Sequence, residues 1–147
     1  MSGALYQDEI LAHARAPHGL GALEPCDALH TAVNRLCGDI VDVYLRRRGD
    51  GTLTVGFTAA GCALCRASAS ILMTLTSGVA PEAAQALVSS FIPRFSALDL
   101  PDDATGAPVG TEALFTIRAF PARTKCVLLP WQALAGALAT LADLAPG

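Results

Sequence analysis

The sequence predicts an α+β fold in which a small antiparallel sheet, built around a central hairpin, packs against several helices. Apolar and polar residues alternate over residues 37–45 and again over 53–59, as expected of two half-buried strands joined by a tight turn. Four other segments are predicted to be helical from the spacing of their apolar residues and from their flanking glycines and prolines: residues 4–15, 62–76, 81–92 and 122–144.

The composition favours one domain, spanning residues 1–147. Hydrophobic residues make up 52% of the 147-residue chain and charged residues only 16%, so the chain can bury one continuous core. The net charge is −3 and aromatic residues are 5% of the chain, whereas nucleic-acid-binding domains usually carry a basic face with interleaved aromatic residues. We therefore expect no nucleic-acid partner.

The most apolar segment, residues 127–142, is expected to be a buried helix rather than a membrane span. It is interrupted by Pro130 and Gln132, and a spanning helix needs about 20 nearly uninterrupted apolar residues. The first residues of the chain include Asp8 and Glu9 and no basic stretch, unlike a secretory signal. We therefore expect a cytoplasmic protein with no membrane partner.

The first helix, at residues 4–15, is followed by a loop that is expected to reach about Asn34, and the hairpin comes next. Its first strand places five residues on one face: Cys37, Asp39, Val41, Val43 and Leu45. A turn at residues 49–51 reverses the chain. The returning strand places four residues on the matching face: Leu53, Val55, Phe57 and Ala59.

Glycine and proline bound the two helices after the hairpin. Gly61 ends the second strand, and the helix at residues 62–76 is closed by Gly78 just beyond its last turn. The next helix, residues 81–92, begins with a proline in its first turn, where the missing amide hydrogen costs nothing.

The segment before the last helix carries weaker signals. Residues 93–110 are rich in proline, glycine and aspartate and are expected to be irregular, while residues 112–120 fit either a short helix or a strand. The last helix, residues 122–144, carries a single apolar face: Val127, Trp131, Leu134, Leu138 and Leu141.

The five cysteines raise the question of chemistry, because disulfides are rare in a reducing cytoplasm. Metal binding or thiol chemistry is the leading interpretation, and burial as small apolar side chains is the simpler one. Cys37 and Asp39 leave the same face of a strand. Cys62 opens a helix, where the dipole favours an anionic sulfur, and Cys126 lies in the first turn of another helix. Three thiolates and one carboxylate suit zinc or an iron-sulfur cluster.

Four motifs of the chain resemble the U-type iron-sulfur assembly proteins, the family of IscU, SufU and the N-terminal part of NifU. They are YQDEILAHARAPHGLG at residues 6–21, NRLCGD at 34–39, FTAAGCALCRASAS at 57–70 and PARTKCVLLPWQAL at 121–134. The match runs from about Tyr6 to Leu138. The resemblance implies an IscU/SufU-like fold and four metal ligands: Cys37, Asp39, Cys62 and Cys126.

Within this family the chain is more similar to the SufU branch. Lys125 stands where IscU proteins have a histidine before the third cysteine, and Arg123, Lys125 and the insertion at residues 93–110 fit SufU. The resemblance implies a zinc-bound sulfur acceptor in which Cys37 takes persulfide sulfur from a SufS-like cysteine desulfurase, with other iron-sulfur assembly proteins as further partners. It leaves open whether such a sulfurtransferase-type acceptor counts as an enzyme.

Two other functions stay open at this point. One is a scaffold on which a [2Fe-2S] cluster is assembled from iron and sulfide and then transferred, since the same thiolates suit iron. The other is an interaction module in which zinc only stabilises the fold.

Three residues are candidates for a place beside the ligands: Cys65, Arg123 and Lys125. Cys65 occupies a position that is usually serine in the family and is an extra ligand, a resolving thiol or a core residue, of which we favour the core. The two cations would offset the negative charge of the site, meet an acidic partner surface, or simply be solvated. Cys26 and the histidines at positions 13, 18 and 30 are expected to lie outside the site, His13 in the first helix and the other two in loops.

Overall fold

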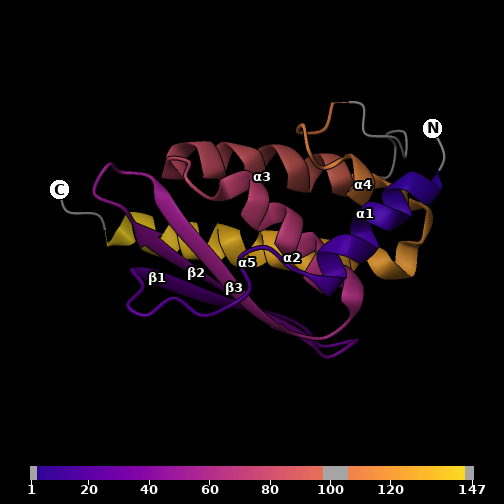
Figure 1. Ribbon diagram of the computed structural model, residues 1–147, viewed down its shortest axis with the longest axis horizontal. Helices are drawn as coiled ribbons and strands as arrows, with labels where there is room; N and C mark the ends of the chain where they lie inside the picture. The colour runs from indigo at the N-terminus through magenta and orange to yellow at the C-terminus, as the bar shows by residue number, and fades with distance from the viewer. Residues whose placement is uncertain (1–2, 98–105, 145–147) are drawn as a thin grey trace.

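The structure, a computed structural model, describes residues 3–97 and 106–144. Helices gather on one face of a three-stranded antiparallel sheet, with the long C-terminal helix running between the sheet and the helices farther from it (Figure 1). The predicted α+β class, with a small antiparallel sheet packed against several helices, is confirmed.

The sheet is a simple meander of β1 (Ala28–Asn34), β2 (Asp39–Arg47) and β3 (Leu53–Ala60), in that order. The predicted hairpin is β2 and β3, paired so that Val43 lies opposite Phe57. Its inner face is apolar and buried on both strands, as the alternation predicted: Val41, Val43, Leu45, Leu53, Val55 and Phe57.

Strand β1 corrects the expectation of a loop reaching Asn34. It pairs with β2 along its whole length, from Ala28 opposite Leu45 to Asn34 opposite Asp39. Most side chains of β1 are exposed, so the alternation that marks a half-buried strand is weak. His30, which was expected in a loop, lies in this strand.

The helical predictions are confirmed, with shifts at their ends. They correspond to α1 (Gly3–Arg15), α2 (Ala63–Thr76), α3 (Pro81–Ser96) and α5 (Thr124–Asp143). Helix α3 continues through Pro93, which was expected to begin irregular chain, because the next turn buries Phe95 against the core. The rest of the expected irregular stretch falls partly on residues 98–105, outside the described residues.

The undecided segment at residues 112–120 is helical and not extended. It forms α4 (Glu112–Phe115) and a 3-10 turn, η1 (Thr116–Ala119), and a second 3-10 turn, η2 (Pro121–Arg123), leads into α5. Buried Leu114 and Phe115 anchor this short segment to the core.

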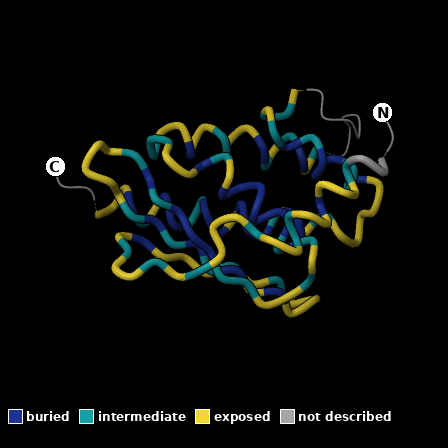
Figure 2. Tube along the Cα trace, in the orientation of Figure 1, coloured by how far each residue is buried: buried dark blue, intermediate teal, exposed yellow. Residues whose placement is uncertain are grey.

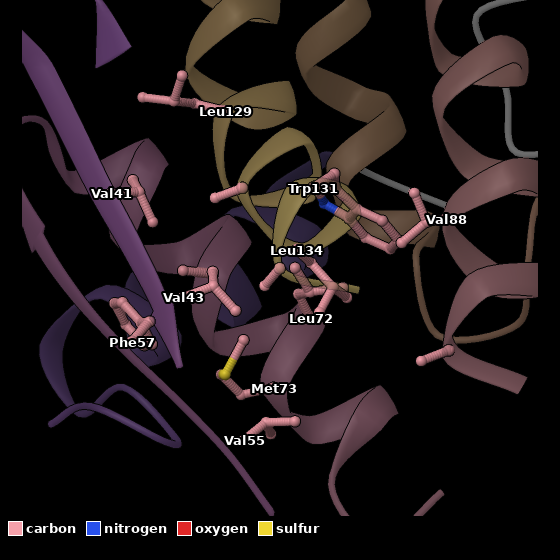
Figure 3. Packing of buried hydrophobic residues seen from close by; sticks show 14 of the residues in the cluster. Val41, Val43, Val55, Phe57, Leu72, Met73, Val88, Leu129, Trp131 and Leu134 are labelled. Carbon is pink, nitrogen blue, oxygen red and sulfur yellow. The ribbon is translucent and has the colours of Figure 1, made fainter. Parts of the chain in front are cut away.

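Helix α5 is the centre of the core. It contacts β1, β2, α2 and α3, and all five residues of its predicted apolar face are buried. The Trp131 ring stacks on Phe91 of α3 with centroids 3.8 Å apart, and Figure 3 shows Trp131 and Leu134 between the side chains of the strands and those of the helices. The buried segments lie through the middle of the molecule, while exposed chain is found in the loops and on the outer sides of the helices (Figure 2).

The burial of α5 also accounts for its apolar sequence. Residues Pro121–Asp143 are long and apolar enough to cross a membrane by length and composition alone, but 56% of the most apolar window is buried inside the protein. The expectation of a buried helix at this position is confirmed.

One buried hydroxyl links α2 to α5. Ser68 Oγ donates a hydrogen bond to the Val127 carbonyl oxygen at 2.6 Å and accepts one from Trp131 Nε1 at 3.1 Å. Both side chains are fully buried, so no solvent can replace these bonds. The contact links the two helices whose N-terminal ends carry Cys62, directly before α2, and Cys126, in the first turn of α5.

Ser68→Ala is expected to lower the free energy of unfolding by about 1–3 kcal/mol, because it leaves the buried Trp131 Nε1 without a partner. In the double variant with Trp131→Phe, the free energy of unfolding is expected to fall by less than the sum of the two single decreases, because both substitutions remove the same hydrogen bond. Urea denaturation of the four proteins measures this, with the exposed Ser90→Ala as a control. Strictly additive losses would show that the hydrogen bond contributes nothing.

Candidate metal centre

Four chemically active side chains from distant segments meet at one end of the sheet. Cys37, predicted to lie on the first strand of the hairpin, lies instead in the turn between β1 and β2, because the strand begins only at Asp39. Cys62 directly precedes α2, and Cys126 lies in the first turn of α5. The ligand atoms of Cys37, Asp39 and Cys126 lie within 4.8 Å of one another. Cys62 Sγ is 3.4 Å from Asp39 Oδ2. The fold thus brings together the four residues that the sequence singled out as ligands.

Strand register explains why Asp39 and Cys62 meet. Ile40 of β2 pairs with Ala60 of β3, so the end of β3 lies beside the start of β2. Asp39 is on the inner face of the sheet, with the buried residues of β2, and is only 3% exposed. From there its Oδ1 accepts a hydrogen bond from the Cys62 amide at 3.1 Å.

Gly61 makes this close approach possible. A β-carbon at this position would overlap the Asp39 carboxylate, so any other residue would push the carboxylate away. The sequence pattern marked Gly61 only as the end of a strand. Its role at the site depends on a contact between two segments, which no local signal reveals.

The turn that carries Cys37 is held by its own hydrogen bonds. Asn34 Oδ1 accepts from the Leu36 amide at 3.1 Å, and the Asn34 carbonyl accepts from the Gly38 amide at 2.8 Å. Gly38 has a φ of +75°, a left-handed conformation that favours glycine. The turn therefore presents Cys37 at its tip, where the residue is exposed.

The thiols and the carboxylate perturb each other electrostatically. Burial raises the pKa of Asp39, but hydrogen bonds from the Cys37, Cys62 and Cys126 thiols and from the Cys62 amide outweigh it, and the pKa is lowered overall. Burial, reinforced by Cys62 and Asp39, raises the pKa of Cys126 to about 12. The protein alone thus favours an ionised Asp39 carboxylate beside a neutral Cys126 thiol, and a bound cation is what would favour the Cys126 thiolate.

Exposure differs sharply among the four residues. Asp39 and Cys126 are each 3% exposed, Cys62 is half-buried, and Cys37 is exposed. The site is therefore anchored in the core on one side and open at Cys37.

Cys65 is fully buried, as the favoured interpretation expected, and lies one turn along α2 from Cys62. Burial raises its pKa well above the ordinary range, and the charge of Asp39 adds to the effect. That Cys65 does not bind metal stays a prediction.

Cys26 is half-buried in the loop before β1, away from the cluster. His13 packs against α2, where its Nδ1 lies 2.6 Å from Ser70 Oγ.

The two cations proposed to lie beside the ligands are exposed at the start of α5. Arg123 directly precedes the helix and Lys125 is its second residue. Lys125 also lines a groove of about 410 Å³ between the Cys37 turn and α5, opposite Arg35 and Leu36 of the turn, with Leu128 and Leu129 at its side. The sequence did not predict this groove, because it forms between two segments about 90 residues apart.

The donor set suits a soft or borderline cation. Three sulfurs and one carboxylate oxygen match the tetrahedral, closed coordination of zinc, and thiolate-rich sites also hold iron-sulfur clusters. Hard cations such as magnesium prefer oxygen ligands throughout, so this set does not fit them.

Comparisons with known proteins agree with this arrangement. The family model described as the NifU-like N-terminal domain matches residues 5–127. A protein of Bacillus subtilis named zinc-dependent sulfurtransferase SufU is 30% identical over 88% of this chain and 86% of its own length. A protein of Streptococcus pyogenes named iron-sulfur cluster assembly scaffold protein IscU is 29% identical over 91% of this chain and 82% of its own.

Solved structures show the same fold. The N-terminal part of a NifU-like protein from Brucella abortus superposes with a TM-score of 0.81 at 27% identity, covering 98% of this chain and all of that one. The predicted IscU/SufU-like architecture is confirmed. The chain belongs to the NifU-like N-terminal domain family, the U-type family of iron-sulfur cluster assembly that its cysteine motifs predicted.

Proposed function

We propose that the protein works in iron-sulfur cluster assembly as a zinc-bound sulfur acceptor, in which Cys37 takes persulfide sulfur from a SufS-like cysteine desulfurase. One observation carries the proposal. Of the four residues at the site, Cys37 alone is exposed, at the tip of a turn, while Asp39, Cys62 and Cys126 are buried or half-buried beneath it. The arrangement separates one exposed thiol, which a partner protein can reach directly, from three groups that lie deeper in the site.

Cys37, Asp39, Cys62 and Cys126 would hold one zinc ion. Zinc keeps thiolates deprotonated at neutral pH and has no redox chemistry of its own. Asp39, Cys62 and Cys126 are fixed by the sheet and by the starts of two helices, so they keep their places when Cys37 moves to meet a donor.

The transfer itself is a thiol–persulfide exchange. The Cys37 sulfur attacks the terminal sulfur of the donor's persulfide, a new S–S bond forms, and the donor's own S–S bond breaks. The donor cysteine leaves as a thiolate, and Cys37 becomes the persulfide. The exchange is balanced without an added oxidant or reductant, because one S–S bond replaces another.

The groove beside Cys37 supports docking of the donor. Arg35 and Lys125 face it from opposite walls, and Leu36, which is 85% exposed, stands at the tip of the turn. A donor segment with an apolar residue flanked by carboxylates matches both the shape and the charge. We propose that Lys125 serves this contact, and that Arg123 lies at its margin.

A cluster scaffold is the second candidate, because the same three thiolates suit iron and the IscU relative is as similar as the SufU relative, at 29% and 30% identity. Metal analysis separates the two. One zinc that survives anaerobic cluster reconstitution supports the acceptor, and zinc displaced by a stable coloured cluster supports the scaffold. A zinc-stapled module without sulfur transfer would show neither cluster nor desulfurase stimulation.

The cytoplasmic location and the single domain over residues 1–147 stay predictions.

Cys37→Ala is expected to abolish persulfide on the protein and stimulation of desulfurase turnover, while about one zinc per chain is retained by the three remaining ligands. Mass spectrometry of the chain after incubation with desulfurase and cysteine measures the persulfide. Cys26→Ala is the matched control, since its half-buried thiol lies outside the site. Undiminished stimulation by Cys37→Ala would contradict the proposed role.

Cys65→Ser is expected to leave the zinc content at about one per chain, because Cys65 is a buried core residue. The zinc-edge absorption spectrum of both proteins should show three sulfur neighbours and one lighter atom. Four sulfurs in the unmodified protein that fall to three in Cys65→Ser would instead make Cys65 a ligand.

Gly61→Ala is expected to weaken zinc affinity by about tenfold or more, because the added methyl group displaces the Asp39 carboxylate from the Cys62 amide. Competition with a chromogenic chelator measures the affinity. Gly49→Ala is the control, since a β-carbon at Gly49 has open space around it. Equal affinities of the two variants would show that the close contact at Gly61 does not matter for the metal.

A further inference from the structure

A second cysteine lies directly behind the proposed ligand Cys62. Cys62 is the N-cap residue of α2 and Cys65 is three positions later, in the first helical turn. The side chains of an N-cap residue and of the residue three positions later lie on the same side of the helix start, which is how a capping box forms. Cys62 is half-buried at the site, Cys65 is fully buried, and the proposed sulfur transfer uses only the first of them.

We propose that Cys62 and Cys65 form a reversible disulfide, a redox modification site whose oxidation withdraws Cys62 from the metal. The pairing itself does not depend on the proposed function. The consequence for the metal does, because it takes Cys62 as a ligand.

The local geometry allows the bond with a small movement. Residues three apart on a helix have Cβ atoms about 5–6 Å apart, and a disulfide needs about 3.5–4.5 Å. Cys62 can supply the difference, because its backbone is extended (φ −79°, ψ 164°) and precedes the first helical residue, Ala63. Within the described chain its sulfur makes no capping hydrogen bond to the first helical turn, so what must be given up is the 3.4 Å contact with Asp39 Oδ2 and the contact with the Cys126 thiol.

The two sulfurs differ in access, which sets the order of events. Cys65 is fully buried, so an oxidant from solvent cannot reach it first. Cys62 is half-buried beside the open side of the site and meets the oxidant. This is the arrangement of a reactive thiol with a resolving thiol behind it.

The proposed oxidant is a hydroperoxide, and the chemistry is balanced in two steps. The Cys62 thiolate attacks the peroxide oxygen, the O–O bond breaks, and Cys62 becomes a sulfenic acid while hydroxide, or an alkoxide from an organic peroxide, leaves. The Cys65 thiol then attacks the Cys62 sulfur, the S–O bond breaks, and water leaves as the disulfide forms. The two thiols lose two electrons and the peroxide gains them. A dithiol reverses the step by thiol–disulfide exchange.

Hydrogen peroxide on the zinc-loaded full-length protein tests the proposal. Released zinc is followed with a chromogenic chelator, the disulfide is mapped by peptide mass spectrometry, and recovery is measured after dithiothreitol and re-addition of zinc. After peroxide we expect a Cys62–Cys65 linkage and loss of zinc. After dithiothreitol and re-addition of zinc we expect the protein to bind nearly as much zinc as before. Cys65→Ser should instead be oxidised by further peroxide to the sulfinic acid at Cys62, which dithiothreitol does not reduce, and should recover only a minor fraction of its zinc. Cys26→Ser, outside the site, should behave as the unmodified protein does.

Two results overturn the pairing: a disulfide that joins Cys37 to Cys62 or Cys126 as the main product, or recovery of zinc by Cys65→Ser as complete as in the unmodified protein. Peroxide treatment of the metal-free protein separates this proposal from the proposed function. A Cys62–Cys65 disulfide in a protein that neither binds zinc nor accepts sulfur leaves the pairing intact and removes the proposed function. Normal zinc binding and sulfur transfer in a protein that does not form this disulfide overturn the pairing and leave the proposed function intact.

Discussion

The Asp39 carboxylate joins the parts of the molecule on which the site depends. It begins β2, lies on the buried face of the sheet, and accepts a hydrogen bond from the Cys62 amide at the start of α2. A buried carboxylate is costly unless it is well bonded, and here amide and thiol donors satisfy it. This contact sets the angle at which the chain leaves β3 and enters α2. The proposed ligands are therefore positioned by the fold before any metal arrives.

The core supports the other half of the site. Helix α5 spans the sheet and carries Cys126 in its first turn, and the buried bonds of Ser68 to Val127 and Trp131 keep α5 in register with α2. The link adds to the packing of the two helices and holds the two proposed ligands at their N-terminal ends, Cys62 and Cys126, in fixed relative positions. A buried polar contact of this kind favours a single arrangement of the elements that it joins.

Much of the fold follows from local patterns, and the exceptions have physical causes. The hairpin and the apolar face of α5 were predicted because burial imposes a period on the sequence. Strand β1 was missed because most of its side chains are exposed and show no clear alternation, and the end of α3 was missed because burial of Phe95 outweighs a proline. The four ligand candidates were chosen through family motifs, since whole elements separate them. Gly61 and the groove beside Lys125 depend on contacts between distant segments, which no pattern within one segment records.

The turn at Cys37 is joined to the rest of the molecule more loosely than the other three positions are. Moving Cys126 would unwind the first turn of α5, and moving Asp39 would disturb the pairing of β2 with β1. Cys37 can move outward with the loss of only a few hydrogen bonds within its own turn. The stability of the fold and the proposed contact with a partner therefore depend on different residues. Arg35 and Leu36 are exposed, so substitutions there would alter the proposed docking surface with little effect on the free energy of unfolding.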